Sequence, residues 1–84
     1  MTTLTLNIYR PNGKHYGVAT VTEAGGLLDI EIPLVEGEPL GSIKAGRGWT
    51  VYQQVRRACE FAFRETPVTY IDLECGFKLT VPSR

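Results

Sequence analysis

The 84-residue sequence contains few of the residues that carry metal, redox or nucleophilic chemistry, with one histidine and two cysteines. His15 has no cysteine or carboxylate at the spacing of metal ligands, so we expect no metal site. A nucleophilic pair would need Cys59 or Cys75 beside His15 with a third, orienting group, and no such spacing is present. The sequence therefore predicts a protein that is not an enzyme and that uses no cofactor.

The cysteines are also too few for a disulfide framework, which in small secreted domains usually takes about four or more. We interpret Cys59 and Cys75 as reduced thiols that act as small apolar side chains. An alternative stays open, because Cys59 falls on the inner face of the expected helix and Cys75 on an inward strand position. Two thiols placed in this way can meet as a redox pair.

Long apolar runs and excess charge of one sign are absent as well. No apolar run approaches the roughly 20 residues that cross a bilayer, and the first residues lack the basic and apolar regions of a secretion signal. We therefore expect a cytoplasmic protein that does not bind membranes. Nine Lys and Arg offset nine Asp and Glu, and this formal net charge of zero argues against a general nucleic-acid coat. The length and the 43% hydrophobic content predict a single domain over residues 1–84.

A helix is predicted from residue 51 to residue 65. Thr50 followed three residues later by Gln53 is a capping box, which starts helices, and Pro67 ends the helix by disfavouring the helical conformation at Thr66. The expected inner stripe is Val51, Val55, Ala58, Cys59 and Ala62. The expected outer face is Gln53, Arg56, Arg57, Glu60 and Arg64.

Three strands are predicted before the helix, because short segments there alternate apolar and polar residues. They cover residues 3–10, 15–23 and 27–34. Asn12-Gly13 predicts a two-residue type I′ turn after the first strand, and Gly25-Gly26 predicts a turn after the second. Pro33 indicates that the third strand ends there or lies at a sheet edge. The inward residues expected on the first and third strands are Leu4, Leu6, Ile8, Leu28, Ile30, Ile32 and Leu34.

Two further strands are predicted over residues 68–75 and 77–81, joined by a tight turn at residues 74–77. The order along the chain is strand, strand, strand, helix, strand, strand. The simplest arrangement is an α+β fold of two layers, in which an antiparallel sheet of about five strands carries one helix on one face. Because edge strands can pair across a two-fold axis, the pattern also leaves a homodimer open.

The segment from residue 36 to residue 49 is predicted to be a long loop, since glycines and prolines interrupt it repeatedly. Its part from Gly41 to Gly48 runs into the helix N-terminus, where backbone N–H groups favour anions. The order of a Walker phosphate-binding loop is absent, however, so a plain connector is the favoured interpretation. Trp49 either covers the helix end against the core or serves as an exposed anchor for a partner.

Two surfaces of opposite charge are expected. Asp29 and Glu31 share the sheet face that cannot pack on the helix with Tyr70, Asp72 and Glu74, and these carboxylates form one acidic patch if their two strands are neighbours. A basic patch is expected from Arg47, Arg56, Arg57 and Arg64. Ordinary solvated faces have the same composition, so both docking and simple solvation remain open.

The second half of the chain has a glycine-punctuated loop, one alanine-containing helix and a closing hairpin. The residues concerned are Lys44, Ala45, Gly46, Ala58, Ala62, Pro67, Tyr70, Ile71, Lys78, Leu79 and Pro82. With the three preceding strands, this layout resembles some small phage-encoded anti-CRISPR proteins, the inhibitors of type I surveillance complexes. The resemblance implies a non-enzymatic inhibitor that binds a Cas protein or Cas complex in the cytoplasm of an infected host cell, often at surfaces meant for nucleic acid.

The leading hypothesis is therefore an inhibitor that binds a Cas protein or a type I complex through a charged surface, without binding nucleic acid itself. Its candidate partner-binding residues are Asp29, Glu31, Trp49, Tyr70, Asp72 and Glu74. The alternative is a nucleic-acid-binding or regulatory module that uses the basic helix face and its leading loop. Its candidate residues are Arg47, Arg56, Arg57 and Arg64.

Overall fold

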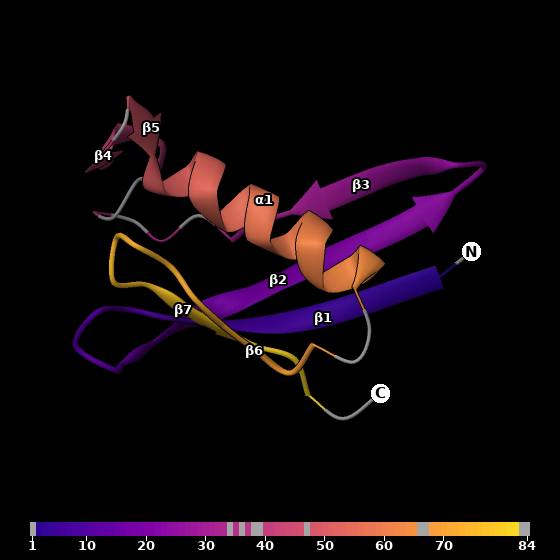
Figure 1. Ribbon diagram of the computed structural model, residues 1–84, viewed down its shortest axis with the longest axis horizontal. Coiled ribbons are helices and arrows are strands. Elements are labelled where there is room, and N and C mark those ends of the chain that lie inside the picture. Colours follow the sequence, from indigo (N-terminus) through magenta and orange to yellow (C-terminus); the bar gives the residue numbers. More distant parts are fainter. Residues whose placement is uncertain are drawn as a thin grey trace.

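The computed structural model describes residues 2–33, 35, 37, 40–46, 48–65 and 68–82. One five-stranded antiparallel sheet and one α-helix account for most of these residues, and a small two-stranded sheet accompanies them (Figure 1). The helix packs on one face of the large sheet. The predicted α+β fold of two layers is therefore confirmed.

The large sheet has the strand order β3-β2-β1-β7-β6, and each neighbouring pair is antiparallel. Its strands are β1 (Thr2–Tyr9), β2 (His15–Ala24), β3 (Leu27–Glu31), β6 (Tyr70–Asp72) and β7 (Lys78–Thr80). The first three strands form a meander, whereas β7 returns to pair with β1. As a result β1 is the central strand, and β3 and β6 are the two edges. Strand β3, which precedes Pro33, is an edge strand, as predicted.

Helix α1 (Val51–Arg64) begins with the predicted capping box. Gln53 N donates to Thr50 Oγ1 over 3.2 Å, and Thr50 N donates to Gln53 Oε1 over 2.8 Å. All five residues of the predicted inner stripe are buried. The helix ends at Arg64, where Glu65 takes an extended conformation. The predicted stop signal at Thr66 and Pro67 lies outside the described residues.

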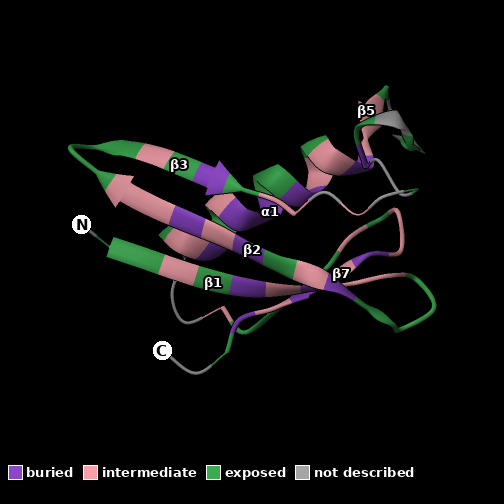
Figure 2. Ribbon diagram, turned by 180° about the vertical axis from the view of Figure 1, so that it is seen from behind, coloured by how far each residue is buried: buried purple, intermediate pink, exposed green. Residues whose placement is uncertain are grey.

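The core fills the space between the inner face of the sheet and α1. Residues opposite one another in the ladder share this face, such as Ile8 beside Leu79 and Val21 beside Ile30. Side chains of the sheet's other face remain exposed or half-buried, and Figure 2 shows this alternation of buried and exposed residues along β1 and β2. One side of the sheet is thus free of any covering layer in the described part of the chain.

The helix is not centred on the sheet. Its main sheet contacts are with β2 and β3, and they bury the inward residue Ile30, while Leu28 stays half-buried. Ile30 on β3 is only 7% exposed. At the opposite edge, Ile71 of β6 and the following Leu73 stay half-buried. This difference leaves the inner face of the sheet less covered beside β6.

The connection from β1 to β2 differs from the predicted two-residue turn. Gly13 N donates to Arg10 O and Arg10 N donates to Lys14 O, both over 2.8 Å, which closes a three-residue loop. Pro11 explains the difference, because its fixed φ suits the first central position of a type I turn. Gly13 then takes a positive φ of 87°, as the bulge that follows such a turn requires.

The other two turns are located as predicted. Gly25 and Gly26 have φ values of 61° and 83°, the two positive angles of a type I′ turn, and they join β2 to β3. Between β6 and β7, Leu73 N donates to Phe77 O over 2.9 Å. Gly76, at a φ of 97°, completes this second three-residue loop.

Several predicted boundaries were wrong. The strand predicted over 27–34 ends at Glu31, before Pro33, and Leu34 lies outside the described residues. The strands predicted over 68–75 and 77–81 are shorter, because the turn between them takes up residues on both sides.

The predicted loop over residues 36–49 contains regular structure. It includes η1 (Leu40–Ser42), β4 (Lys44–Gly46) and the start of β5 (Trp49–Thr50). Gly48, the residue just before β5, has a φ of 75°, a conformation that glycine adopts readily.

Candidate functional site

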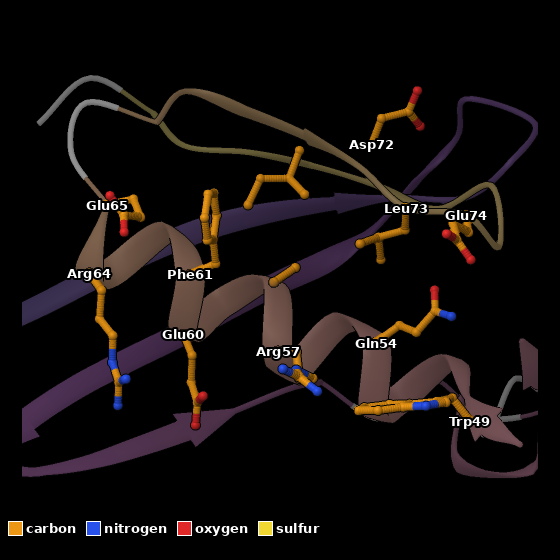
Figure 3. A pocket seen from close by; sticks show the side chains of 12 residues that line it. Trp49, Gln54, Arg57, Glu60, Phe61, Arg64, Glu65, Asp72, Leu73 and Glu74 are labelled. Carbon is orange, nitrogen blue, oxygen red and sulfur yellow. The ribbon is translucent and has the colours of Figure 1, made fainter. Parts of the chain in front are cut away.

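A groove with a volume of about 640 Å³ lies between α1 and the edge strand β6 with its following turn (Figure 3). Its middle is apolar. Ala58 and Phe61 line it from the helix, and Ile71 and Leu73 line it from the strand side. Figure 3 shows Leu73 directed toward the helix and Phe61 directed toward the strand. This groove is the part of the inner face that the off-centre helix leaves open.

Phe61 is the main exposed apolar side chain in the groove. It is 53% exposed, although it is a large aromatic residue on a helix whose inner stripe is buried. Sequence reasoning missed it, since Phe61 was placed on neither face of the helix. Its spacing of three residues from Ala58 was the available signal, because residues at i and i+3 are neighbours on a helix surface.

The charges around the groove are mixed, with an excess of carboxylates. Two arginines line it, Arg57 and Arg64. Four carboxylates line it as well, Glu60, Glu65, Asp72 and Glu74. The groove therefore has a negative balance at neutral pH even though the chain as a whole has a formal net charge of zero.

Trp49 closes one end of the groove. It is half-buried, it does not belong to the core cluster, and the guanidinium carbon of Arg57 lies 5.0 Å from the centroid of its ring. An arginine over an indole face is a favourable cation–π arrangement. Trp49 therefore does not cover the helix end against the core, and a part of its surface stays accessible beside the groove.

The predicted single acidic patch is wrong. Asp29 and Glu31 are exposed on β3, whereas Asp72 lies on β6 and Glu74 in the turn after it, and β2, β1 and β7 separate the two edges. Four strand spacings amount to about 19 Å, which exceeds the Debye length of about 8 Å at physiological salt. The reason is topological, since the last hairpin pairs with β1 and not with β3.

The groove nevertheless brings together half of the candidate partner-binding residues. Trp49, Asp72 and Glu74 line it, and Tyr70 lies two residues from Asp72 on β6, where it is 52% exposed. Figure 3 shows Asp72 directed away from the helix, so its carboxylate lies on the rim.

The basic candidates are divided. Arg56, Arg57 and Arg64 are exposed on α1, as predicted, but of these only Arg57 and Arg64 line the groove. Glu60 lies between them on the same helix. Arg47 lies outside the described residues. The helix therefore presents arginines interrupted by a carboxylate, and not a continuous basic stripe.

The helix N-terminus is not an open anion cradle. Val51 N donates to Ile43 O over 2.9 Å, and Gln53 N donates to Thr50 Oγ1. Free amides of the first turn are what an anion would bind. Two of them are already occupied by the chain itself, which argues against an anion site at this end of the helix.

Both cysteines are free, as predicted. Cys59 is fully buried, and burial raises the pKa of its thiol to about 12, so the thiol stays protonated at neutral pH. Cys75 is half-buried in the turn after β6. Cys59 is therefore a core residue and a poor nucleophile.

His15 lies on the free face of the sheet. Its Nε2 is 3.1 Å from Asn7 Oδ1, and its ring meets that of Tyr9 edge-on at 5.4 Å. Among the described residues, no group of three or more His, Cys, Asp or Glu side chains is placed to hold a metal ion. The described part of the chain also contains no helix of the length and apolar character that a bilayer crossing takes.

Comparison of the chain with protein-family models, with curated proteins and with solved structures finds no match.

Proposed function

We propose that this is a small non-enzymatic protein that binds a partner protein through the groove between α1 and β6. The observation that carries the proposal is the exposed Phe61 over an apolar floor of Ile71 and Leu73, with Trp49 at one end. Aromatic side chains within a rim of polar residues are typical of protein-binding hot spots.

The charge balance favours a protein partner over nucleic acid. Phosphates bind where lysines and arginines dominate, whereas carboxylates outnumber arginines in this groove. Arg57, one of the two arginines, is in addition stacked on Trp49. A partner surface with lysines or arginines beside an apolar side chain fits the groove better.

We further propose that the partner is a Cas protein or a type I CRISPR surveillance complex in the cytoplasm of the host cell. The support for this step is the resemblance of the second half of the chain to phage-encoded anti-CRISPR proteins. Surfaces of such complexes that hold nucleic acid are rich in basic side chains, and the carboxylates of Asp72 and Glu74 are complementary to them. Occupation of such a surface would exclude the nucleic acid.

The proposal is tested by plaque formation. Bacteria that carry a type I CRISPR system directed against a phage are made to express the protein, across a panel of type I subtypes. We expect restored plaque formation in at least one subtype. The double variant Asp72→Lys, Glu74→Lys should lose this effect, because it reverses the charge of the rim.

The opposite edge of the sheet supplies a matched control. Asp29→Lys, Glu31→Lys makes the same change in charge on exposed strand residues, away from the groove. This control should inhibit as the unchanged protein does, and both variants should melt within a few degrees of it. Failure to restore plaques in any subtype would contradict the inhibitor proposal, and equal loss in both variants would contradict the assignment of the groove.

A further inference from the structure

The backbone of β6 has an open edge beside the groove. Within the described part of the chain, β6 pairs only with β7. Val81 N donates to Thr69 O over 3.0 Å, and Leu73 N donates to Phe77 O over 2.9 Å. Since alternate residues of an antiparallel strand bond to the same neighbour, residues 69, 71 and 73 face β7. The N–H and C=O groups of Tyr70 and Asp72 therefore point out of the sheet.

We propose that the partner contributes an extended segment that binds as an additional strand beside β6 and fills the groove; this inference rests on the proposed function. An added strand satisfies the outward backbone groups of Tyr70 and Asp72 by main-chain hydrogen bonds. Its side chains alternate between the two faces of the sheet. Every second side chain then enters the groove, against Phe61, Ile71 and Leu73.

The chemistry of the segment follows from this alternation. Side chains that enter the groove meet an apolar floor, so they are apolar. Side chains on the other face lie beside Tyr70 and Asp72, at an edge where Glu74 is also exposed. Lys78 is the cross-strand neighbour of Asp72 on β7, and a lysine or arginine of the added strand would flank this carboxylate from its open side. The segment therefore alternates apolar and basic residues.

The edge strand β3 does not offer the same site. The helix contacts β3, and Ile30, one of its two inward residues, is only 7% exposed, while the other, Leu28, is half-buried against the core. A strand added there would lie away from the groove and from Phe61, Ile71 and Leu73. Pro33, just beyond β3, also lacks a backbone donor, which is a common protection of sheet edges. Strand addition is thus specific to the β6 edge.

A second copy of this chain fits the edge less well than a basic segment does. Pairing of two β6 strands would bring two grooves together in which carboxylates outnumber arginines. Like charges at an interface oppose association. The expected occupant is therefore a segment of another protein.

The test uses a phage-displayed library of random linear peptides selected on the immobilised protein, followed by synthesis of the enriched peptides. We expect enriched peptides with apolar residues at alternate positions and lysine or arginine between them. Amide hydrogen exchange, followed by NMR, should slow at Tyr70 and Asp72 when such a peptide binds. The amides of β3 should exchange at an unchanged rate.

A matched pair of variants isolates the backbone contribution. Tyr70→Ala and Tyr70→Pro both remove the aromatic ring, but only proline removes the outward N–H, and at this position it breaks no bond to β7. Peptide affinity should fall at least about tenfold further in Tyr70→Pro than in Tyr70→Ala. If circular dichroism shows that Tyr70→Pro does not fold, the exchange rates of the unchanged protein decide the question.

Three results would overturn the inference. The first is a library that yields no enriched peptide. The second is peptide binding without slower exchange at Tyr70 and Asp72, which leaves the proposed function intact and removes only strand addition. The third is slower exchange at these amides with rising protein concentration and no peptide, which identifies a second copy as the occupant. The plaque assay tests the proposed function itself, independently of these three results.

Discussion

At the scale of single residues, the bulge in β2 decides how the segment after β3 is held. Ile8 pairs with Gly17 and Tyr9 with His15, so Tyr16 is an extra residue that turns inward and is buried. Its hydroxyl donates to Pro33 O over 3.1 Å. This bond fixes the chain beyond the edge strand to the core.

Gly17 allows this arrangement because it has no side chain. A Cβ at this position would lie 2.6 Å from Pro33 Cγ, and the rigid proline ring cannot move aside without shifting the backbone. We expect Gly17→Ala to lower the free energy of unfolding by about 1–3 kcal/mol, the usual cost of overpacking. Chemical denaturation measures this change.

Gly41 supplies the control for Gly17. A Cβ there meets nothing within 4 Å, and its φ is not positive. Gly41→Ala should therefore change the stability by no more than about 0.5 kcal/mol in the unfavourable direction. Equal losses in the two variants would show that the contact with Pro33 is not the cause.

At the scale of elements, the start of α1 depends on the reciprocal bonds of Thr50 and Gln53. Thr50→Ala removes the acceptor of the Gln53 amide, and we expect a loss of about 1 kcal/mol. For a domain of this size, such a loss lowers the melting temperature by about 4–8 °C. Scanning calorimetry measures the shift.

A double-mutant cycle tests whether the two capping residues act together. If they do, Thr50→Ala combined with Gln53→Ala should cost less than the sum of the single changes, because both single changes remove the side-chain bond from Thr50 Oγ1 to Gln53 Oε1. Additive losses would contradict the capping box as a coupled pair.

The same element shows what the sequence could predict. The inner stripe of α1 and the inward residues of β1 follow from local periodicity, which any packing of this helix on this sheet must satisfy. The turn at Asn12-Gly13 was assigned to the wrong type because Pro11 shifts the turn by one residue. The β4 and β5 strands were missed because they have only three and two residues, which is too short for an alternating pattern to appear.

At the scale of the whole molecule, the sequence left the strand order open. Asp29 and Asp72 each lie on the outer face of a short strand with alternating residues. The two strands nevertheless form opposite edges of the sheet. The order depends on which strand pairs with the central β1, a non-local choice that alternation within a strand cannot encode.

The groove was beyond prediction for the same reason. It exists because α1 lies over β2 and β3 and leaves the inner face beside β6 uncovered. Trp49, Asp72 and Glu74 were singled out from their residue types, whereas Phe61 and the open backbone of β6 required the three-dimensional arrangement. Site residues were therefore predicted in part, and the site itself was not.

We propose that the groove, and not the free face of the sheet, binds the partner. Phe61 in the groove and Val18 on the free face are both large apolar residues of similar exposure, 53% and 46%. Phe61→Lys and Val18→Lys thus each replace an exposed apolar side chain by a lysine, one in the groove and one on the free face. Neither should disturb the core, and circular dichroism of each variant should match that of the unchanged protein.

The most direct measurement is the affinity of the protein and of these two variants for immobilised type I surveillance complexes, by surface plasmon resonance. We predict that Phe61→Lys weakens binding at least about tenfold, equivalent to about 1.4 kcal/mol, while Val18→Lys binds as the unchanged protein does. Undiminished binding by Phe61→Lys, or a loss confined to Val18→Lys, would contradict this prediction.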